Sequence, residues 1–507
     1  MKNYRKDGGF VMNLMYKSTR NSEHKVLASQ AILQGLSSDG GLYVPEVIPQ
    51  LTKSIDELAN MSYSELAYEV MKLYFTDYTE QELKTCINYA YDDKFDTPEI
   101  APIKAVGDSY YMELFHGATI AFKDMALSIL PHLLTTAAKK NNVKEEIVIL
   151  TATSGDTGKA ALSGFADVEG TKIIVFYPKD GVSSVQKKQM VTQKGNNVMV
   201  VGIEGNFDDA QTGVKAIFNN KKLAKQMEET GYRFSSANSI NIGRLIPQVV
   251  YYVYAYANLY KNNQIENGEK INFVVPTGNF GNILAAYYAK NMGLPINKLI
   301  CASNENKVLY DFLETGRYDK NREFILTSSP SMDILVSSNL ERLIYQIADC
   351  DSSVVRELME ALSSEGVYEI SDRMKDNLGD FVGGWSDSKE TQKTIHRVYM
   401  EDKYVLDTHT AVASGVYNSY VKNTGDKSKT VIVSTASPYK FTDSVLEAIQ
   451  SDKLPADDYD QALILKDLSA VNIPKAVEEI HYAPVLHKST CKTGEMENVI
   501  KSYLKII

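Results

Sequence analysis

Lys123 is the residue in this sequence whose setting first suggests chemistry. It follows a mostly apolar stretch that ends at Phe122 and precedes a second apolar run, Met125–Leu130. A lysine in such a setting either extends its amine to the surface along its aliphatic stem or is used chemically. Burial lowers the pKa of an amine, which can then act as a nucleophile or base near neutral pH. On this stretch alone, the surface lysine is the better interpretation.

Two glycine-containing turns could bind anions. Each lies between a predicted buried strand and a predicted helix, at Ala152–Gly158 and Pro276–Asn282. Glycines let the backbone approach a ligand closely, and the free N–H groups of a first helical turn favour an anion. The second turn fits a phosphate group and the first fits a carboxylate, although neither is a dinucleotide-binding or P-loop pattern. An ordinary strand-to-helix turn or a helix N-cap explains each turn about equally well.

Two further polar groups lie beside predicted elements. The segment Asn238–Arg244 offers an amide, a hydroxyl and a guanidinium just before a helix, and arginine is suited to bidentate contact with phosphate. In isolation, a capped helix with a surface arginine is the simpler interpretation. Thr435 follows the predicted strand Val431–Ser434, at the sheet edge where ligands bind in open α/β proteins.

The elements that must position these residues alternate between strands and helices from Ala101 onward. Buried strands are predicted at residues 110–114, 146–151, 172–177, 197–201, 271–275, 299–303 and 430–434. Helices are predicted at residues 125–140, 159–166, 184–194, 208–218, 244–260 and 283–292, and residues 330–400 are also expected to be helical. This alternation is typical of βαβ units around a parallel sheet.

The region before Ala101 has a different pattern. Residues 12–100 are predicted to be mainly helical, with helices near 26–35, 55–73 and 80–91, and they contain no cluster of catalytic residue types. We therefore expect three domains: a mainly helical one at 1–100, a smaller α/β domain with Lys123 at 101–235, and a larger α/β domain with the second turn at 236–507. Residues 1–11 are a possible extension, because Met12 begins a second plausible start.

The composition restricts the class of protein. With 44% hydrophobic and 23% charged residues, the chain is typical of a soluble globular protein, and its net charge of −10 argues against a nucleic-acid or anionic-membrane partner. The four cysteines are far apart and form no C-x-x-C pair, which argues against structural zinc or disulfides and favours a reducing cytoplasm. We found no apolar stretch long enough to span a bilayer, and no signal or transit peptide pattern.

Taken together, the motifs resemble the threonine synthase family, in its longer three-domain branch. This family belongs to the pyridoxal-phosphate-dependent enzymes that share the fold of the tryptophan synthase β subunit. The matching segments occur in the right order over most of the chain: 16–20, 38–45, 115–124, 152–158, 236–241, 276–281 and 435–441. Each motif alone is moderately specific, but the ordered set is highly specific.

The resemblance implies an α/β protein of pyridoxal-phosphate fold type II, with two open, mainly parallel sheet domains, flanking helices and the mainly helical N-terminal domain. It implies a lyase that converts O-phospho-L-homoserine and water to L-threonine and phosphate, the last step of threonine biosynthesis. Lys123 would bind pyridoxal 5'-phosphate covalently and move protons during catalysis. Thr435 would face the pyridine nitrogen of the cofactor, and a neutral hydroxyl there should suppress transamination.

Other residues are assigned by the same motif match. The cofactor phosphate would be held by the second turn, at Gly278, Asn279, Phe280, Gly281 and Asn282. The substrate carboxylate would be received by Ser154, Gly155 and Thr157, and the substrate phosphate by Asn238, Ser239 and Arg244. No metal is expected.

Asp156 departs from the pattern of many proteins with this fold, which have Asn at this position, bonded to the phenolic oxygen of the cofactor. An ionised Asp156 would repel a phenolate there. Either a proton is shared between the two groups, or Asp156 has another task.

Two alternatives to the threonine-forming reaction remain. A threonine or serine dehydratase on the same scaffold would need no phosphate-binding segment at Asn238–Arg244. A catalytically silent, metabolite-binding relative would have no need of Lys123. The expected partner is the small-molecule substrate, without nucleic acid or membrane, and the protein is expected to be a cytoplasmic monomer or homodimer.

Overall fold

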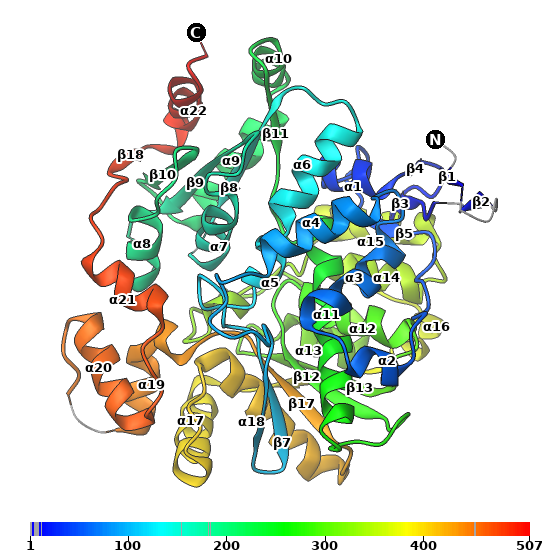
Figure 1. Cartoon of the computed structure of the whole chain (residues 1–507), viewed down its shortest axis with the longest axis vertical. Helices are drawn as coiled ribbons and strands as arrows, with labels where there is room; N and C mark the ends of the chain where they lie inside the picture. Colours follow the sequence, from blue (N-terminus) through cyan, green and yellow to red (C-terminus); the bar gives the residue numbers. More distant parts are fainter. Residues whose placement is uncertain are drawn as a thin grey trace.

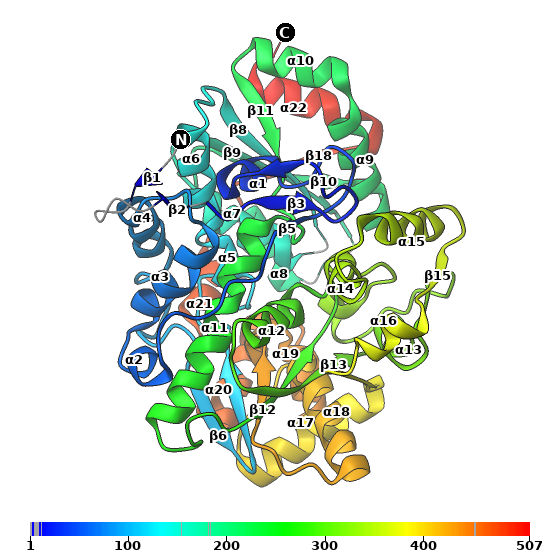
Figure 2. The same cartoon turned by 90° about the vertical axis from the view of Figure 1, so that its right-hand side faces the viewer.

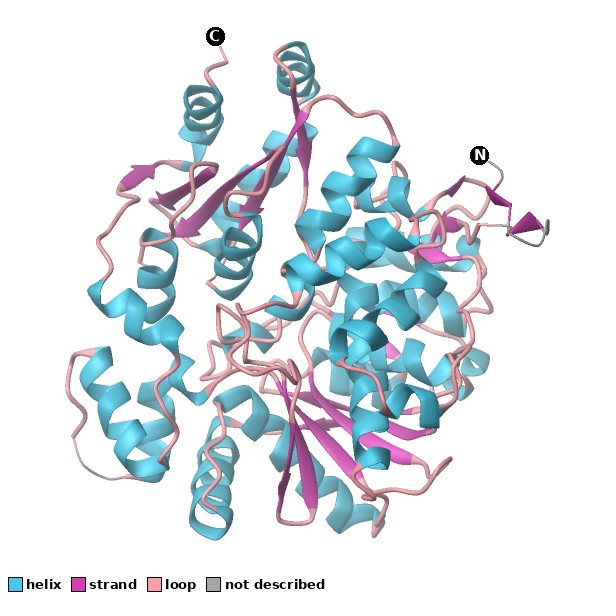
Figure 3. Cartoon of the chain, viewed as in Figure 1, coloured by secondary structure: helices cyan, strands magenta, loops and turns pink. Residues whose placement is uncertain are grey.

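A computed structural model describes residues 3–4, 10–11, 13–153, 155–180, 182, 184–450 and 453–506. Within these residues the strands form two main sheets at opposite ends of the molecule, with helices around both (Figure 1) (Figure 3). Both candidate start residues, Met1 and Met12, lie outside the described residues. No helix in the described ranges is long and apolar enough to cross a membrane.

The larger sheet has six strands in the order β16-β13-β12-β17-β7-β6. The strands are β6 (Ile103–Val106), β7 (Ser109–Glu113), β12 (Ile271–Pro276), β13 (Ile296–Ser303), β16 (Phe381–Trp385) and β17 (Thr430–Ser434). All neighbouring pairs are parallel except the β6–β7 hairpin. The central strands are buried on both faces, which explains their continuous apolar sequences.

The smaller sheet has five strands, all parallel, in the order β11-β8-β9-β10-β18. The strands are β8 (Glu146–Ala152), β9 (Thr171–Pro178), β10 (Val198–Ile203), β11 (Tyr232–Ser235) and β18 (Ser489–Cys491). Its edge strand β18 comes from the C-terminal part of the chain, which returns to this sheet in red in Figure 1.

The sheets are not divided as simply as the chain order suggests. β6 and β7 come before the smaller sheet in sequence but lie in the larger one, since β7 pairs with β17. β18 follows the larger sheet in sequence but belongs to the smaller one. Long-range strand pairing of this kind leaves no local signal in the sequence. The predicted division at residues 101 and 236 remains an expectation.

The helices surround the sheets and the space between them. They are α1 (Ala28–Gln34), α2 (Ile55–Ala59), α3 (Tyr63–Tyr74), α4 (Glu80–Ala90), α5 (Asp124–Leu127), α6 (Leu130–Lys140), α7 (Asp156–Phe165), α8 (Ser184–Val191), α9 (Phe207–Asn219), α10 (Lys221–Glu229), α11 (Ile242–Lys261), α12 (Gly281–Asn291), α13 (Val308–Thr315), α14 (Leu340–Ile347), α15 (Ser352–Ser364), α16 (Asp372–Asp376), α17 (Ser388–Asp402), α18 (Thr408–Thr424), α19 (Thr442–Ile449), α20 (Asp458–Ser469), α21 (Lys475–Tyr482) and α22 (Met496–Leu504). Short 3-10 helices lie at η1 (Pro330–Met332), η2 (Pro438–Lys440) and η3 (Thr493–Glu495).

Helix α11 is the central helix of the protein. Nearly all its residues are buried, and it packs against α2, α3, α5, α6 and α12. One large apolar core therefore includes the N-terminal helices, α11 and parts of both sheets. In Figure 2 the N-terminal helices lie along α11, between the two sheets.

The N-terminal part differs in detail from the helical prediction. It contains α1 to α4, and also a three-stranded antiparallel sheet in the order β4-β3-β5. Its strands are β3 (Tyr16–Ser18), β4 (Lys25–Val26) and β5 (Tyr43–Pro45). Strands this short have no periodicity that would distinguish them from loops.

Two predicted helices are each divided. The helix expected at 125–140 is divided into α5 and α6 just before Pro131, which lacks a backbone N–H and is placed in the first turn of α6. The helix expected at 55–73 is divided into α2 and α3, because Ser62 begins a new helix by accepting a hydrogen bond from the Glu65 N–H.

Candidate active site

Lys123 lies between the two main sheets, immediately before α5. Its Nζ donates hydrogen bonds to Asp156 Oδ2 at 3.2 Å and to Ser331 Oγ at 3.0 Å. Burial lowers the pKa of the Lys123 amine, and the nearby cations Lys440 and Arg244 lower it further, while Asp156 opposes them. The surface lysine, favoured on the local sequence alone, is therefore wrong, because tertiary packing encloses this amine.

The loop before Lys123 is held by the segment that follows β17. Leu114 N–H donates to the Ser434 carbonyl at 2.9 Å, Phe122 N–H donates to the Thr435 carbonyl at 2.8 Å, and residues 121 and 436 form an isolated antiparallel bridge. Since β7 and β17 are neighbours in the sheet, their C-terminal extensions run side by side. The fold thus brings Thr435, which is buried, next to the Lys123 loop.

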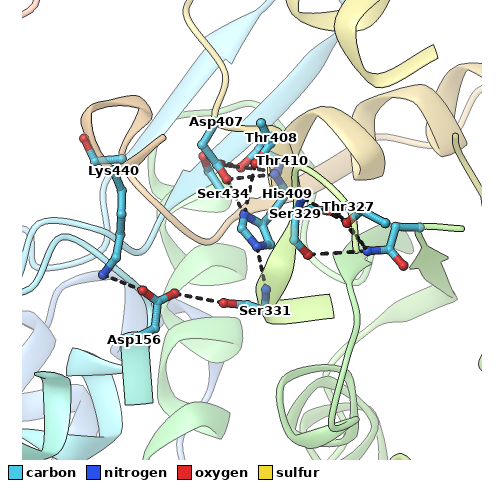
Figure 4. Close-up of polar contacts among 12 residues, drawn as sticks. Asp156, Thr327, Ser329, Ser331, Asp407, Thr408, His409, Thr410, Ser434 and Lys440 are labelled. Carbon is cyan, nitrogen blue, oxygen red and sulfur yellow. Dashed lines mark hydrogen bonds and ion pairs between the residues drawn. The ribbon is translucent and has the colours of Figure 1, made fainter. Parts of the chain in front are cut away.

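Asp156 is the first residue of α7 and is buried in a set of hydrogen-bond donors (Figure 4). Oδ2 accepts from Lys123 and from Ser331 Oγ, the latter at 2.8 Å. Oδ1 accepts from Lys440 Nζ at 2.9 Å and from Gln186 Nε2 at 3.0 Å. Burial alone would raise the pKa of Asp156, but the two lysines outweigh it and hold the pKa well below its usual range. Asp156 is therefore a carboxylate.

The turn before α7 depends on glycine. Gly155 has φ of +138°, and a Cβ there would meet the Gln186 side chain at 2.4 Å. Thr153 Oγ1 stabilises the turn by accepting from the N–H groups of Gly155 and Gly158 at 3.0 and 2.9 Å. Thr157 is half-buried in the first turn of α7, and Ser154 lies outside the described residues. The carboxylate-binding role of this turn remains a prediction.

The second turn connects β12 to α12. A Cβ on Gly278 would lie 2.6 Å from the carbonyl oxygen of Ser331, so only glycine fits this close approach. Phe280 caps α12 in the left-handed conformation, with φ of 61°, and its ring is buried. The first turn of α12 has no acidic side chain, and its N–H groups lack intrahelical partners. This arrangement favours an anion.

Two residues of the second turn differ in what their side chains do. Asn279 is exposed, and its carbonyl accepts from the backbone and side-chain N–H groups of Asn339 at 3.1 and 2.9 Å. Asn282 is buried, and its Oδ1 accepts from the hydroxyls of Tyr251 and Tyr252 at 2.8 and 2.5 Å. The side-chain oxygen of Asn282 is therefore used within the protein, whereas its Nδ2 is buried without a hydrogen-bond partner among the described residues and can still donate to an anion.

Arg244 is buried on α11 near its N-terminus. One guanidinium nitrogen donates to the Ala237 carbonyl at 2.8 Å, while Nε has no hydrogen-bond partner among the described residues. Burial lowers the pKa of this guanidinium to about 10, and its charge acts on Lys123. The surface arginine considered from the sequence is thus excluded by burial. A buried cation with an unpaired donor is costly unless an anion binds there.

The segment before α11 is connected to the second turn. Asn339 Nδ2 lies 3.4 Å from Ser239 Oγ and also donates to the Asn279 carbonyl, so that one amide connects the two predicted phosphate sites. Asn238 is exposed, and the structure gives its side chain no protein partner within the described hydrogen bonds. Its role in substrate binding remains a prediction.

Several residues that hold this site together could not be predicted from the sequence. Ser331 in η1 contacts both Lys123 and Asp156, and its N–H donates to His409 Nε2 at 3.1 Å. His409 Nδ1 in turn lies 3.0 Å from the buried Asp407, as Figure 4 shows. Lys440 was present in a recognised motif but had no assigned role. Ser331 and His409 carried no local signal, because a serine beside a proline and a histidine in a helix are ordinary.

The residues fit the cofactor that the resemblance implied. A buried lysine with a lowered pKa suits covalent attachment to an aldehyde. The glycine turn before α12 offers backbone N–H groups to a phosphate. Lys440 balances the charge of Asp156, so that Asp156 would repel a phenolic oxygen of the cofactor less than an unpaired carboxylate would. No group of three or more His, Cys, Asp or Glu among the described residues could hold a metal ion.

Comparisons with known proteins agree with this fold and site. Three family models match the chain, the last two with an overlap: "Threonine synthase N terminus" at residues 15–91, "Pyridoxal-phosphate dependent enzyme" at 104–436 and "Threonine synthase, C-terminal" at 410–480. The threonine synthase of Saccharomyces cerevisiae is 35% identical over 86% of this chain and 89% of its own.

Two further comparisons concern a longer relative and a solved structure. Threonine synthase-like 1 of Macaca fascicularis is 39% identical over 89% of this chain, but the match spans only 62% of that longer protein. The crystal structure of a pyridoxal-phosphate-bound threonine synthase from Brucella melitensis superimposes with a TM-score of 0.83, at 34% identity, over 97% of this chain and 99% of its own. The predicted α/β fold class with parallel sheets is confirmed, and the chain belongs to the threonine synthase family of pyridoxal-phosphate-dependent enzymes.

Proposed function

We propose that this protein converts O-phospho-L-homoserine and water to L-threonine and phosphate, with pyridoxal phosphate bound to Lys123. The observation that carries the proposal is the buried Arg244, whose Nε has no protein partner among the described residues and whose charge acts on Lys123. An enzyme whose substrate lacked a phosphate group would bury this cation without compensation. Membership of the threonine synthase family supports the same reaction.

The cofactor, when bound, supplies an electron sink for the electrons of the bonds broken at the substrate carbons. Lys123 is proposed to take protons from Cα and Cβ of the substrate and to return them later. Its lowered pKa suits this exchange near neutral pH, because a neutral amine can accept a proton and the resulting ammonium can give it back. Its contacts with Asp156 and Ser331 would orient the amine.

Arg244 is proposed to bind the substrate phosphate, with help from Asn238 and Ser239. As the Cγ–O bond breaks, the leaving phosphate gains negative charge, so Arg244 should stabilise the transition state more than the ground state. Water then adds at Cβ, and protons returned to the carbon chain complete threonine. One water is consumed, and one phosphate is released.

The remaining assignments are part of the same proposal. The turn Gly278–Asn282 would hold the cofactor phosphate, Thr435 would face the pyridine nitrogen, and the turn that includes Gly155 and Thr157 would receive the substrate carboxylate. We also infer a cytoplasmic location, since the described cysteines are unpaired, and a monomeric or homodimeric protein.

The experiment is an assay of purified protein with pyridoxal phosphate and O-phospho-L-homoserine. We expect phosphate and threonine in equal amounts, measured by a phosphate assay and by chromatography of the amino acids. Serine or threonine, offered without phosphohomoserine, is the matched control substrate. Formation of 2-oxobutyrate from threonine, without turnover of phosphohomoserine, would show a dehydratase instead. No turnover of any of these substrates would support a silent relative.

A further inference from the structure

A second buried lysine contacts the same carboxylate as Lys123. Lys440 lies at the end of η2, its side chain is fully buried, and its Nζ donates to Asp156 Oδ1 and to the Thr119 carbonyl, both at 2.9 Å. Asp156 thus accepts from a different lysine on each of its two oxygens (Figure 4 draws the Lys440 side). Nothing in the proposed reaction so far uses Lys440.

The local backbone fixes Lys440 toward Asp156. Pro438 begins the 3-10 turn, Ser437 Oγ accepts from the Tyr439 N–H at 3.3 Å, and the Lys440 N–H donates to the Ser437 carbonyl at 3.0 Å. The Tyr439 hydroxyl also donates to the Val471 carbonyl at 2.5 Å. Since Ser437 N–H bonds to the Ile120 carbonyl, the same turn is attached to the Lys123 loop.

The two lysines are not equivalent partners for Asp156. The nitrogen of Lys123 is the one that binds the cofactor and exchanges protons, so its charge varies during the reaction. Lys440 has no assigned part in either process, so the proposed chemistry leaves its charge unchanged. A buried carboxylate needs a counter-charge at every stage, because removing one partner of a buried pair leaves an uncompensated charge. Lys440 can supply that constant counter-charge.

This pair also explains why an aspartate can stand at position 156. A neutral asparagine would need no cation behind it, whereas a carboxylate beside a phenolic oxygen needs its charge balanced. Together, Lys440 and Asp156 carry no net charge, and Asp156 Oδ2 can still accept a hydrogen bond.

We propose that Lys440 is a positioning residue that balances part of the charge of Asp156 beside Lys123, so that Asp156 and Lys440 act as one unit that sets the proton affinity of the Lys123 nitrogen. The proposal rests on the assignment of Lys123 as the lysine that binds the cofactor. The structure supports it through the short contacts of Asp156 with both lysines and the complete burial of Lys440.

The charged groups around Asp156 and Lys440 determine whether loss of Lys440 raises or lowers the proton affinity of the Lys123 nitrogen. Lys123, Lys440 and Arg244 are the cations that act on one another through the site, and Asp156 is the anion between the lysines. Lys159 and Asp124 interact with Lys440 from farther away. Loss of the Lys440 charge removes repulsion from Lys123 and exposes it to the full charge of Asp156. Both changes raise the proton affinity of the Lys123 nitrogen.

The test is a pH titration of the visible absorbance of the lysine-bound cofactor in the full-length protein. In Lys440→Met we expect the midpoint to rise by about one pH unit or more, the size of shift that a nearby charge produces. In Asp156→Asn the midpoint should fall. In the double variant, Lys440→Met should shift the midpoint less than it does beside Asp156, because the carboxylate through which it acts is gone.

Lys159→Met is the matched control. Lys159 is also a buried lysine, but its Nζ donates to Gln193 Oε1 at 2.5 Å, and it has no hydrogen bond or ion pair with Asp156 among the described contacts. The titration midpoint of the lysine-bound cofactor in Lys159→Met should equal that of the unmodified protein. Lys440→Arg should largely restore the midpoint, since a cation remains.

Thermal unfolding of the same proteins gives a second measurement. Lys440→Met and Asp156→Asn should each lower the unfolding temperature, and the double variant should lose less than the sum of the two. If Lys440→Met does not fold, the double variant should recover folded protein.

An unchanged midpoint in a folded Lys440→Met protein would overturn the proposal, as would strictly additive losses of stability. If the unmodified protein shows no absorbance band of a lysine-bound cofactor, the assignment of Lys123, on which the proposal depends, is refuted instead.

Discussion

The two sheets supply different kinds of group to the site between them. Strand ends of the six-stranded sheet lead to the Lys123 loop, the glycine turn and Thr435, after β7, β12 and β17 respectively. The end of β8 in the five-stranded sheet leads instead to Asp156, which already places a carboxylate in the first turn of α7. Two turns with the same local pattern therefore differ in charge: α7 carries its own anion, whereas α12 has no acidic residue in its first turn.

This difference teaches that the strand–glycine–helix pattern alone does not define an anion site. The dipole of a helix favours an anion at its N-terminus whether a ligand or the protein supplies it. At α7 the protein supplies Asp156 and balances it with two lysines, so the substrate carboxylate proposed for the turn before α7 would bind beside an existing anion. At α12 the position is left to a ligand, and we assign it to the cofactor phosphate.

Removing the amine at the edge of the six-stranded sheet should have the largest effect. Lys123→Ala should lower turnover by at least about 1000-fold, because both cofactor attachment and proton transfer are lost. Steady-state assay of phosphate release and the absorbance spectrum provide the measurements. Lys159→Ala is the control, because Lys159 is a buried lysine that has no hydrogen bond or ion pair with Asp156 among the described contacts. A lysine-bound absorbance band that persists in Lys123→Ala would contradict the assignment.

Removing the unpaired cation of α11 should have the next largest effect. Charge-assisted hydrogen bonds contribute roughly 1.5–3 kcal/mol each, so Arg244→Ala should lower kcat/KM for phosphohomoserine by about 10- to 100-fold. We expect kcat to fall and KM to rise, while the cofactor spectrum is preserved. Arg233, which is exposed on β11, provides the matched control Arg233→Ala. Normal kinetics in Arg244→Ala would place the substrate phosphate elsewhere.

Crowding the turn before α12 should weaken cofactor binding. The added Cβ in Gly278→Ala would lie 2.6 Å from the Ser331 carbonyl, and overpacking of this kind costs about 1–3 kcal/mol. The dissociation constant for pyridoxal phosphate should rise, measured by titration of the cofactor-free protein. Gly494→Ala, where a Cβ meets nothing within 4 Å, should leave it unchanged. Equal affinities in both variants would show that this turn is not the phosphate site.

The smallest effect concerns stability at the base of the Lys123 loop. Burial opposes protonation of His116, but its hydrogen bonds to Asp96 and Glu113 outweigh burial and raise its pKa from 6.5 to about 9. A raised pKa gives stability that is fully present below the unfolded value and is lost as pH rises through about 9. His116→Gln should therefore cost about 1–2 kcal/mol near neutral pH, after allowing for solvent screening at Asp96.

This last prediction is measured as the difference in urea midpoint between the variant and the natural protein, at about pH 6 and about pH 10. The difference should shrink at the higher pH. His24→Gln, at an exposed histidine, should show no such change. A difference that is constant with pH would mean that His116 contributes through packing alone.

The sequence predicted much of the fold because buried parallel strands have a clear signal. The strands expected at 146–151 and 271–275 are β8 and β12, and the helices that follow them begin within the two glycine turns. The sequence did not predict β11 or β18, because short edge strands have weak periodicity. It also did not predict that β7 joins β17, since that pairing depends on residues far apart in the chain.

The site was predicted where a motif carried the chemistry and missed where only the fold did. Lys123, Asp156 and Thr435 were named from motifs, and the structure brings all three together. Ser331 was not predicted, because it lies 208 residues from Lys123 in the sequence, and a contact between such distant residues leaves no local pattern. The ionisation of Asp156 also could not be decided without the position of Lys440.

The central claim is that Lys123, among the buried lysines, binds the cofactor. The most direct measurement is reduction of the purified protein with sodium borohydride in the presence of pyridoxal phosphate, followed by digestion and mass spectrometry. Reduction fixes the cofactor to whichever lysine holds it. We predict a single modified peptide with the label on Lys123. A label on Lys440 or Lys159 would contradict this account.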